Sequence, residues 1–446
     1  MKHIRIGAGA GYSGDRLQPA LDLIERGNLS YIVFECLAER TIALAQQRKL
    51  ANPEQGYDPM LELRMRAVLS LTTSPRVRII SNMGAANPLA AARKTREIAE
   101  SLGIRNLKIA AITGDDVLSN ICERDLNVIE TGERVSELGS KLVSANAYLG
   151  AAPIVEALAA GADIVLAGRI ADPSLFLAPL LHEFGWDPSD WKRLGSGILA
   201  GHLLECAGQL TGGYFADPGY KEVPGLATLG FPFADIDELG NATFGKLAGT
   251  GGMLTIATCK EQLLYEVHDP SRYVTPDVVA DFSRVRIEEI TDDVIAVADA
   301  DGTERPPKLK VSLGCSEGFC ADGQISYAGA GARQRGELAI EILREQFSLQ
   351  KIAIDEVRYE LIGVNSIVPI RKSDSPDPRE VRLRVAARTR DLQSAKFIIE
   401  TVEALYTNGP AGGGGITGAI TPVMAIYSTF IPREWVAPKV HYEVII

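Results

Sequence analysis

One repeated pattern dominates the first 185 residues of this 446-residue chain: an apolar run, a loop of glycine and small polar residues, and then apolar residues at helical spacing. Such alternation is typical of a parallel α/β sheet. The pattern predicts six strands, at Ile4–Ile6, Tyr31–Phe34, Val77–Ile80, Leu107–Ile112, Lys141–Ala145 and Asp163–Ala167. It predicts helices at Arg16–Arg26, Glu39–Lys49, Pro88–Leu102, Ala152–Ala160 and Pro173–Phe184. We therefore expect residues 1–222 to form one doubly wound α/β domain.

Polar residues follow nearly every predicted strand. Because ligands bind beyond the carboxyl ends of the strands in open α/β sheets, these residues are the candidate site. Some have a simpler interpretation: Asn87 and Asp172 each precede a proline, as helix caps do, and Asp15 is a similar case. Four others directly follow apolar strands and are not obvious caps: Glu35, Asn82, Asn146 and Arg169.

The first strand runs into a loop with four glycines in eight residues, at positions 7, 9, 11 and 14. Glycines let the backbone approach an anionic or carbonyl group closely, and the following helix directs its amide dipoles to the same place. We therefore expect Gly11 and Ser13 to cradle a ligand, with Arg16 as a charged contact.

The same loop has the G-x-G-x-x-G spacing of dinucleotide-binding proteins, and Glu35 follows its last glycine by 21 residues. Pro19 and a capping Asp15 place the start of the helix after the third glycine. The fingerprint needs a helix that opens near the second glycine. Nicotinamide-dependent oxidation remains an alternative.

After residue 222 the strands become shorter, and we expect a second, α+β domain over residues 223–446. Two runs, Lys310–Gly314 and Gln324–Ala328, resemble a hairpin. Further strands and helices give a β-β-α-β-β-α order, which indicates a split β-α-β sandwich. Lys246 precedes another glycine-rich loop and is a candidate contact for a carboxylate or phosphate.

Bulk properties narrow the function. The net charge of −11 argues against partners that need a cationic face, such as nucleic acid or an anionic membrane. The N-terminus lacks the basic and apolar regions of a secretory signal, so we expect a cytoplasmic protein. Residues 409–432 carry no charge, but their glycines and Pro422 make a membrane span improbable.

The spacing of the cysteines indicates the state of the thiols. The six cysteines form no C-x-x-C pair, so we expect reduced thiols and neither disulfides nor a zinc ribbon. His202, Glu205 and Cys206 share one helix face, but their spacing matches no zinc signature. We therefore expect no metal and no cofactor.

Several long motifs, in the same order, resemble the acyclic terpene utilisation protein A family. They are the opening Ile6–Arg16 segment and the segments 167–174, 212–219, 249–252, 262–270 and 275–282. The resemblance spans nearly the whole chain. Longer members carry a small extra C-terminal domain that we expect this protein to lack, so the resemblance implies a small companion subunit. The family's name refers to degradation of branched isoprenoids through acyl-CoA intermediates.

Three functions remain open. The first is a catabolic lyase or isomerase, such as a hydratase or dehydratase, acting on a small carboxylate or its acyl-CoA thioester. In it Glu35 or Asp115 moves the proton, Asn82 and Asn146 hold a carbonyl or hydroxyl, and Arg169 and Arg16 bind carboxylate or phosphate. The second is the nicotinamide-dependent oxidoreductase. The third is a non-catalytic subunit of a catabolic complex. We also expect a homo-oligomer.

Overall fold

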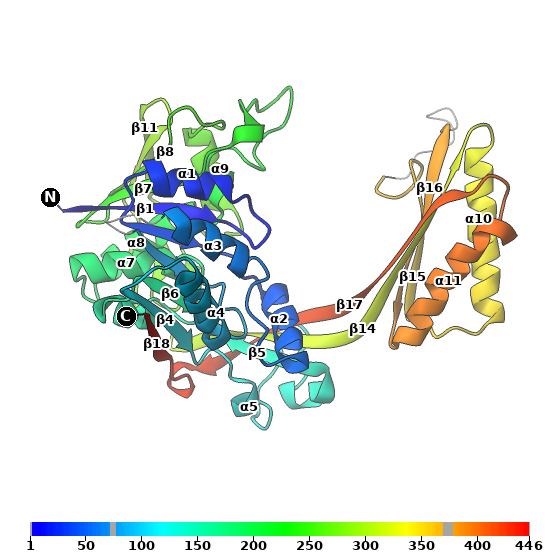
Figure 1. Ribbon diagram of the computed structural model, residues 1–446, viewed down its shortest axis with the longest axis horizontal. Coiled ribbons are helices and arrows are strands. Elements are labelled where there is room, and N and C mark those ends of the chain that lie inside the picture. Colours follow the sequence, from blue (N-terminus) through cyan, green and yellow to red (C-terminus); the bar gives the residue numbers. More distant parts are fainter. Residues whose placement is uncertain (1, 72–76, 369–377, 446) are drawn as a thin grey trace. The chain divides into compact units, whose positions relative to one another are not determined.

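Two compact units make up the structure, a computed structural model that describes residues 2–71, 77–368 and 378–445 (Figure 1). The first comprises Met1–Gly314 and Ile426–Ile446, and the second comprises Cys315–Ala425. The expected division after residue 222 falls inside the first unit, because strands on both sides of it share one sheet. Among the described residues, no helix is both long and apolar enough to cross a membrane.

The first unit is built on a ten-stranded sheet with the order β11-β12-β8-β7-β1-β2-β3-β6-β4-β18. Its centre is parallel: β1 (His3–Ala10), β2 (Tyr31–Phe34), β3 (Arg78–Ser81), β6 (Ile164–Ala167) and β4 (Leu107–Thr113). Antiparallel strands extend both sides: β7 (Pro232–Asp237), β8 (Ala242–Lys246), β12 (Val294–Ala298), β11 (Arg286–Thr291) and β18 (Lys439–Ile445).

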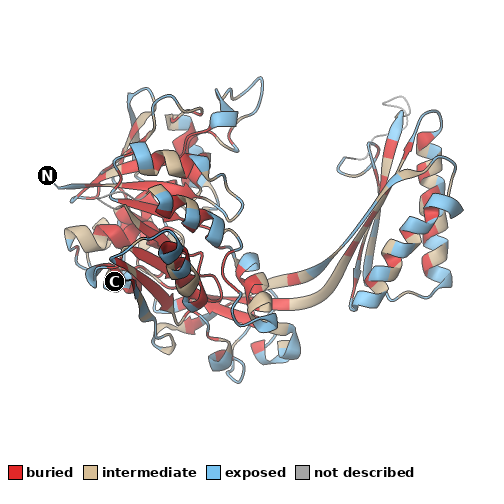
Figure 2. Ribbon diagram, in the orientation of Figure 1, coloured by how far each residue is buried: buried red, intermediate tan, exposed pale blue. Residues whose placement is uncertain are grey.

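The parallel strands are apolar, as expected for strands that are buried on both faces of a sheet. Every residue of β2 and β6 is buried, which is the usual state of central parallel strands (Figure 2). The helices of this unit are α1 (Gln18–Arg26), α2 (Glu39–Ala51), α3 (Leu61–Leu71), α4 (Pro88–Ser101), α5 (Leu118–Ile121), α6 (Ala152–Ala159), α7 (Ser174–Phe184), α8 (Trp191–Glu205) and α9 (Ile256–Leu264). Prolines at the first turn help to start α1, α4 and α6.

Five of the six predicted N-terminal strands form the parallel core. The other, predicted at Lys141–Ala145, is β5 (Leu142–Ala147), which pairs with β14 (Lys308–Ala328) rather than joining the core. A three-stranded sheet of β13 (Asp301–Thr303), β10 (Val279–Asp281) and β9 (Tyr273–Val274) completes the strands of this unit. Short 3₁₀ turns lie at Val135–Lys141, Ala207–Gln209, Leu226–Thr228 and Arg433–Trp435.

The second unit follows the predicted split β-α-β plan. Its elements run β14, α10 (Ala332–Leu349), β15 (Glu356–Ile362), β16 (Glu380–Thr389), α11 (Leu392–Asn408) and β17 (Gly414–Pro432), and its sheet order is β15-β16-β14-β17. The predicted hairpin of Lys310–Gly314 with Gln324–Ala328 is wrong, because both runs belong to the single long strand β14. The predicted class, a parallel α/β sheet followed by an α+β domain, is confirmed.

Candidate functional site

Glu35 and Asn82 meet at the carboxyl ends of the neighbouring strands β2 and β3. A Glu35 carboxylate oxygen accepts hydrogen bonds from the Asn82 side-chain amide at 2.8 Å and from the Leu37 backbone amide at 2.9 Å. Asn82 in turn accepts a bond from the Cys36 backbone amide at 2.7 Å. Both side chains are buried. The predicted juxtaposition follows from the parallel pairing of the two strands.

Arg169, just beyond β6, is the buried cation of this region and is only 1% exposed. Its guanidinium donates hydrogen bonds to the Leu37 carbonyl and to the Asp172 carboxylate. It also lies over the Tyr148 ring, with its central carbon 4.5 Å from the ring centre. Arg169 therefore holds Asp172 and Tyr148 in place, and its Nε is buried without a hydrogen-bond partner among the described residues.

A cavity of about 550 Å³ opens beside this cluster within the first unit. Its acidic and phenolic side chains are Glu39, Tyr148, Asp172, Glu266 and Tyr273, and its cations are Arg272, Lys308 and Lys310. Apolar residues complete the wall: Val274, Pro276, Pro306, Pro307, Leu309 and Phe430. Its size suits a small ligand or one end of a longer one.

Two carboxylates of this cavity have pKa values that their surroundings move in opposite directions. Burial raises the pKa of Asp172 to about 7, helped by the negative charges of Glu205, Glu39 and Glu266 and opposed by Arg169. Burial also acts to raise the pKa of Glu39, but the Tyr148 hydroxyl bond and nearby Arg169 and Lys310 outweigh it and lower that pKa to about 2. One group is thus a fixed anion, while the other exchanges its proton near neutral pH.

Glu35 lies behind this pair. Burial raises its pKa well above the ordinary value, and the charge of Asp172 adds to that effect. Arg169 and the hydrogen bonds from Asn82 and Leu37 act in the opposite direction. Glu35 is therefore a buried acid whose proton is coupled to the charge on Asp172.

Asp115 and Asn146, predicted to belong to the site, fix the loop that carries Arg169. One Asp115 oxygen accepts hydrogen bonds from the Asn146 side chain at 2.9 Å and from the Arg169 backbone amide at 3.0 Å. A Cβ on Gly168 would lie 2.6 Å from either oxygen of this carboxylate, so the glycine is needed for the close approach. In this geometry Asp115 positions the backbone of Arg169.

The N-terminal glycine loop is closed by the protein itself. The Gly11 amide donates to Asp15 at 2.9 Å, and a Cβ on Gly11 would lie 2.6 Å from the backbone carbonyl carbon of Cys206. Helix α1 begins at Gln18, which confirms a start well after the third glycine. Ser13 lines a separate cavity of about 100 Å³. The space above Gly11, which a dinucleotide would need, is filled by the end of α8.

Arg16 and Lys246 lie away from the 550 Å³ cavity. Arg16 donates to the backbone carbonyls of Ala227 at 2.8 Å and Leu226 at 2.9 Å. Lys246 donates to the Thr250 carbonyl at 3.0 Å and pairs with Asp293 at 3.0 Å. Both cations join loops of the fold through these contacts.

The capping interpretation holds for Asn87 but not for Asp172. Asn87 caps α4 by accepting a hydrogen bond from Ala90 at 3.4 Å. Helix α7 has Pro173 at its N-cap and no side-chain cap, because the Asp172 carboxylate turns to Arg169 instead. Asp15 likewise bonds the amides of Gly11 and Arg16 and does not cap α1.

Other groups of the cavity have no clear signal in the sequence. Glu39 is an ordinary first-turn residue of α2, and Glu266, Arg272 and Lys310 come from segments more than 200 residues away from β1. Tyr148 follows β5 directly, so it shares the strand-end position of the predicted site residues. Only the fold brings these groups together.

The buried His202 and the mostly buried Glu205 are in hydrogen-bond contact at the end of α8. The His202 Nδ1 lies 2.9 Å from a Glu205 oxygen, and its Nε2 lies 3.2 Å from the Leu263 carbonyl. The His202 ring packs 5.0 Å from the ring of Tyr273, which lines the cavity. Among the described ranges, no group of three or more His, Cys, Asp and Glu side chains is placed to hold a metal ion.

A larger cavity of about 650 Å³ lies in the second unit and includes Arg382 and several glycines. The Arg382 donors bond to Gln324, to Ser326 at 3.0 Å and to Thr417 at 2.8 Å. The Arg382 guanidinium is therefore already hydrogen-bonded to side chains of the same sheet. The cavity beside Asp172 is the better candidate, since its lining combines a carboxylate of raised pKa with three cations.

Comparison with known proteins agrees with the motifs. The sequence matches the family described as Acyclic terpene utilisation family protein AtuA over residues 4–442. No curated protein and no solved structure matches the chain. Because the match covers almost all of the sequence, the chain belongs to the acyclic terpene utilisation protein AtuA family.

Proposed function

We propose that this protein is a lyase or isomerase that moves a proton on a small carboxylate or its acyl-CoA thioester in the cavity beside Asp172. One observation carries the proposal: Asp172 lines the cavity, is held by Arg169, and has a pKa raised to about 7. A general acid or base is most effective when its pKa lies near the working pH. In a hydratase or dehydratase it would exchange the proton on carbon while water adds or leaves.

The neighbouring groups support this chemistry. The Tyr148 hydroxyl is fixed by its bond to ionised Glu39 and faces the same cavity as Asp172. Glu35 supplies a second buried acid, whose pKa is also raised, with Asn82 to orient it. We assign the direct proton transfer to Asp172. Glu35 would not contact the substrate, and its protonation would depend on the charge of Asp172.

Two cations in the lining of the cavity support an anionic substrate, although the lining also holds the carboxylates Glu39, Asp172 and Glu266. Lys310 is engaged, 3.5 Å from Glu39, but Arg272 and Lys308 form no ion pair within the part of the chain that the structure describes. Exposed cations without partners attract a carboxylate or a phosphate. The apolar wall would take the carbon skeleton.

Proton exchange in D₂O tests the proposal even while the substrate is unidentified. The protein is incubated with a panel of short carboxylates and acyl-CoA thioesters, and ¹H NMR follows loss of α- or β-proton signals and addition of water. We expect exchange with at least one compound and a rate roughly 10²–10⁴-fold lower in Asp172→Asn. Asp292→Asn, at an exposed turn, is the matched control and should keep the wild-type rate.

The other functions give different results. Saturable binding of NADH would favour the oxidoreductase, against which the occupied space at Gly11 argues. No exchange by the chain alone, with exchange in a reconstituted complex that Asp172→Asn leaves unchanged, would favour a non-catalytic subunit. A companion subunit, implied by the family resemblance, remains a proposal that the same reconstitution examines.

A further inference from the structure

Strand β18 forms one outer edge of the ten-stranded sheet (Figure 1). It pairs with β4 through seven consecutive residues, from Lys439 opposite Thr113 to Ile445 opposite Leu107, without a bulge. Among the described residues, no other strand pairs with it. One side of β18 therefore presents unpaired backbone donors and acceptors.

The opposite edge of the same sheet is protected. Strand β11 has an irregular register between Glu289 and Thr291, and three of its six residues are charged. Bulges and charges are the usual means of preventing edge-to-edge pairing. The β18 edge has neither a bulge nor an internal proline, and its two charged residues, Lys439 and Glu443, are of opposite sign. It exposes Tyr442 by 38% and Val444 by 56%.

The sequence of β18 is complementary to itself. In an antiparallel pair centred on His441, Lys439 lies opposite Glu443 and Val440 lies opposite Tyr442. Opposite charges and aromatic or β-branched pairs directly across two strands both stabilise a sheet. The two-fold symmetry repeats each favourable pair, as in an isologous dimer.

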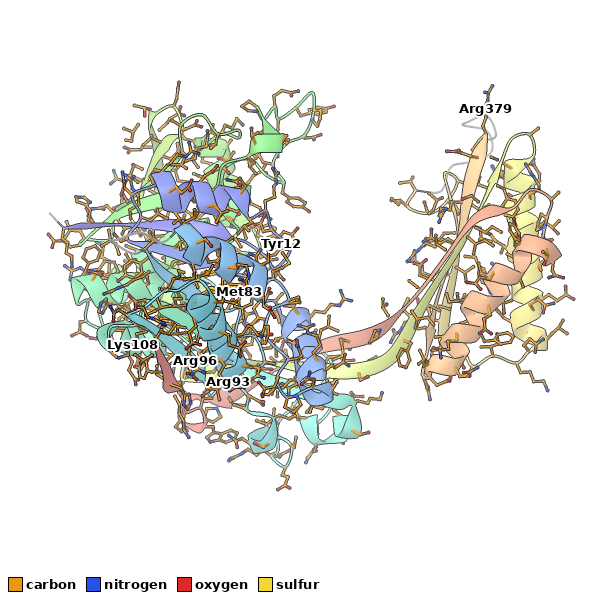
Figure 3. All side chains as sticks on the ribbon, in the orientation of Figure 1. Tyr12, Met83, Arg93, Arg96, Lys108 and Arg379 are labelled. Carbon is orange, nitrogen blue, oxygen red and sulfur yellow. The ribbon has the colours of Figure 1, made fainter. Side chains whose placement is uncertain are left out.

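Neighbouring contacts keep this edge regular and its side chains oriented. Arg96 of α4 and Lys108 of β4, both labelled in Figure 3, contact this strand. Glu443 accepts a hydrogen bond from Arg96 at 2.7 Å, and the Lys108 Nζ lies 4.5 Å from the centre of the Tyr442 ring. His441 bonds to Thr113 at 3.1 Å. The Lys439 side chain is exposed and has no ion-pair partner among the residues that the structure describes.

We propose that a second copy of this chain binds here, with the two β18 strands pairing antiparallel about His441 to join two sheets into one. The proposal rests on the edge of the first unit and is independent of the reaction at Asp172.

Light scattering of the full chain at micromolar concentration tests the dimer. We expect a dimer whose dissociation constant rises roughly tenfold or more in Lys439→Glu, because two attractive pairs become repulsive. The double variant Lys439→Glu/Glu443→Lys should recover most of the affinity. Glu288→Lys, the same kind of charge reversal on β11, should change nothing.

Hydrogen exchange measures the edge directly and does not depend on how the Glu443→Lys change affects Arg96. Amides of residues 439–445 should gain protection with rising concentration in the wild type and not in Lys439→Glu. A monomeric wild type, or a dimer that Lys439→Glu leaves intact with β18 protection unchanged, would overturn the proposal.

Discussion

Neighbouring charges of opposite sign act on the pKa of Asp172. Arg169 stabilises its anion, whereas burial and the carboxylates of Glu205, Glu39 and Glu266 stabilise its neutral form. Although the Asp172 side chain keeps 36% of its surface exposed, at the cavity, the surrounding protein brings its pKa to about 7. Such a balance is typical of functional sites.

This balance predicts how stability depends on pH. The folded pKa of about 7 lies above the ordinary 3.8, so between these values the folded state retains a proton that the unfolded state releases. Stability from this group therefore falls as pH rises from about 4 to 7. We expect the melting temperature of Asp172→Asn, relative to wild type, to be higher at pH 8 than at pH 5. A difference that is independent of pH would contradict the raised pKa; Asp292→Asn serves as the reference.

The His202–Glu205 pair gives a second residue-level prediction. Burial acts to lower the pKa of His202, but the Glu205 carboxylate, helped by the backbone of Leu263 and Gln262, outweighs it and raises that pKa above 6.5. In Glu205→Gln the carboxylate is gone, so we expect the pKa of His202 to fall. Ring ¹³C shifts of the five histidines over a pH titration would measure it. An unchanged His202 titration, as expected for the exposed control Glu261→Gln, would show that Glu205 does not set it.

At the residue scale, the sequence predicted which strand-end residues of the candidate site lie close together, because this depends on strand order. Glu35, Asn82 and Arg169 were identified because each directly follows a strand, and neighbouring parallel strands end side by side. Glu39, Glu266 and Lys310 could not be found, since their proximity depends on the folding of distant segments. Arg16 and Lys246 were plausible cations, but nothing local shows that backbone carbonyls and Asp293 take their donors.

Among the elements, the glycine loop after β1 differs most from its predicted function as a ligand cradle. Gly11 allows α8 to end directly against the loop, because a Cβ on Gly11 would lie 2.6 Å from the backbone carbonyl carbon of Cys206. The buried Arg64 supports the loop from α3 by donating to the carbonyls of Tyr12 and Asp15 at 3.4 and 3.2 Å. The loop is thus a packing device next to the site.

We therefore expect Gly11→Ala to destabilise the protein by about 1–3 kcal/mol, the usual cost of overpacking against a backbone that cannot move easily. Urea denaturation would measure this change. Gly414→Ala is the control, because its Cβ would meet open space. If Gly11→Ala is as stable as the wild type, the loop is not packed as described.

Helices and strands with a clear hydrophobic pattern were predicted well. Which strands pair with each other was predicted less well. The parallel strands were evident because they are apolar on both faces, but periodicity cannot tell that β5 pairs with β14 instead. The hairpin error has a physical cause. Gly318 adopts a φ of 86° inside β14, and such a glycine in sequence resembles a turn although the strand continues.

At the scale of the whole molecule, the first unit is assembled from distant parts of the chain. Strands from residues 232–298 extend the N-terminal parallel core on one side, and β18 extends it on the other. The composition shift near residue 222 marks a change to antiparallel strands within one sheet. The returning C-terminal segment also supplies Arg433, which donates to the carbonyls of Pro276 at 2.6 Å and Pro306 at 3.0 Å, two residues of the cavity wall.

The pH dependence of proton exchange tests the central claim, that Asp172 moves the proton, most directly. For the substrate found in the D₂O panel, we expect the wild-type rate per bound substrate to change steeply near pH 7, where Asp172 titrates. Asp172→Asn should be slower by roughly 10²-fold or more and lose that step. A variant that exchanges within a few-fold of the wild type, with the step near pH 7 intact, would contradict the account.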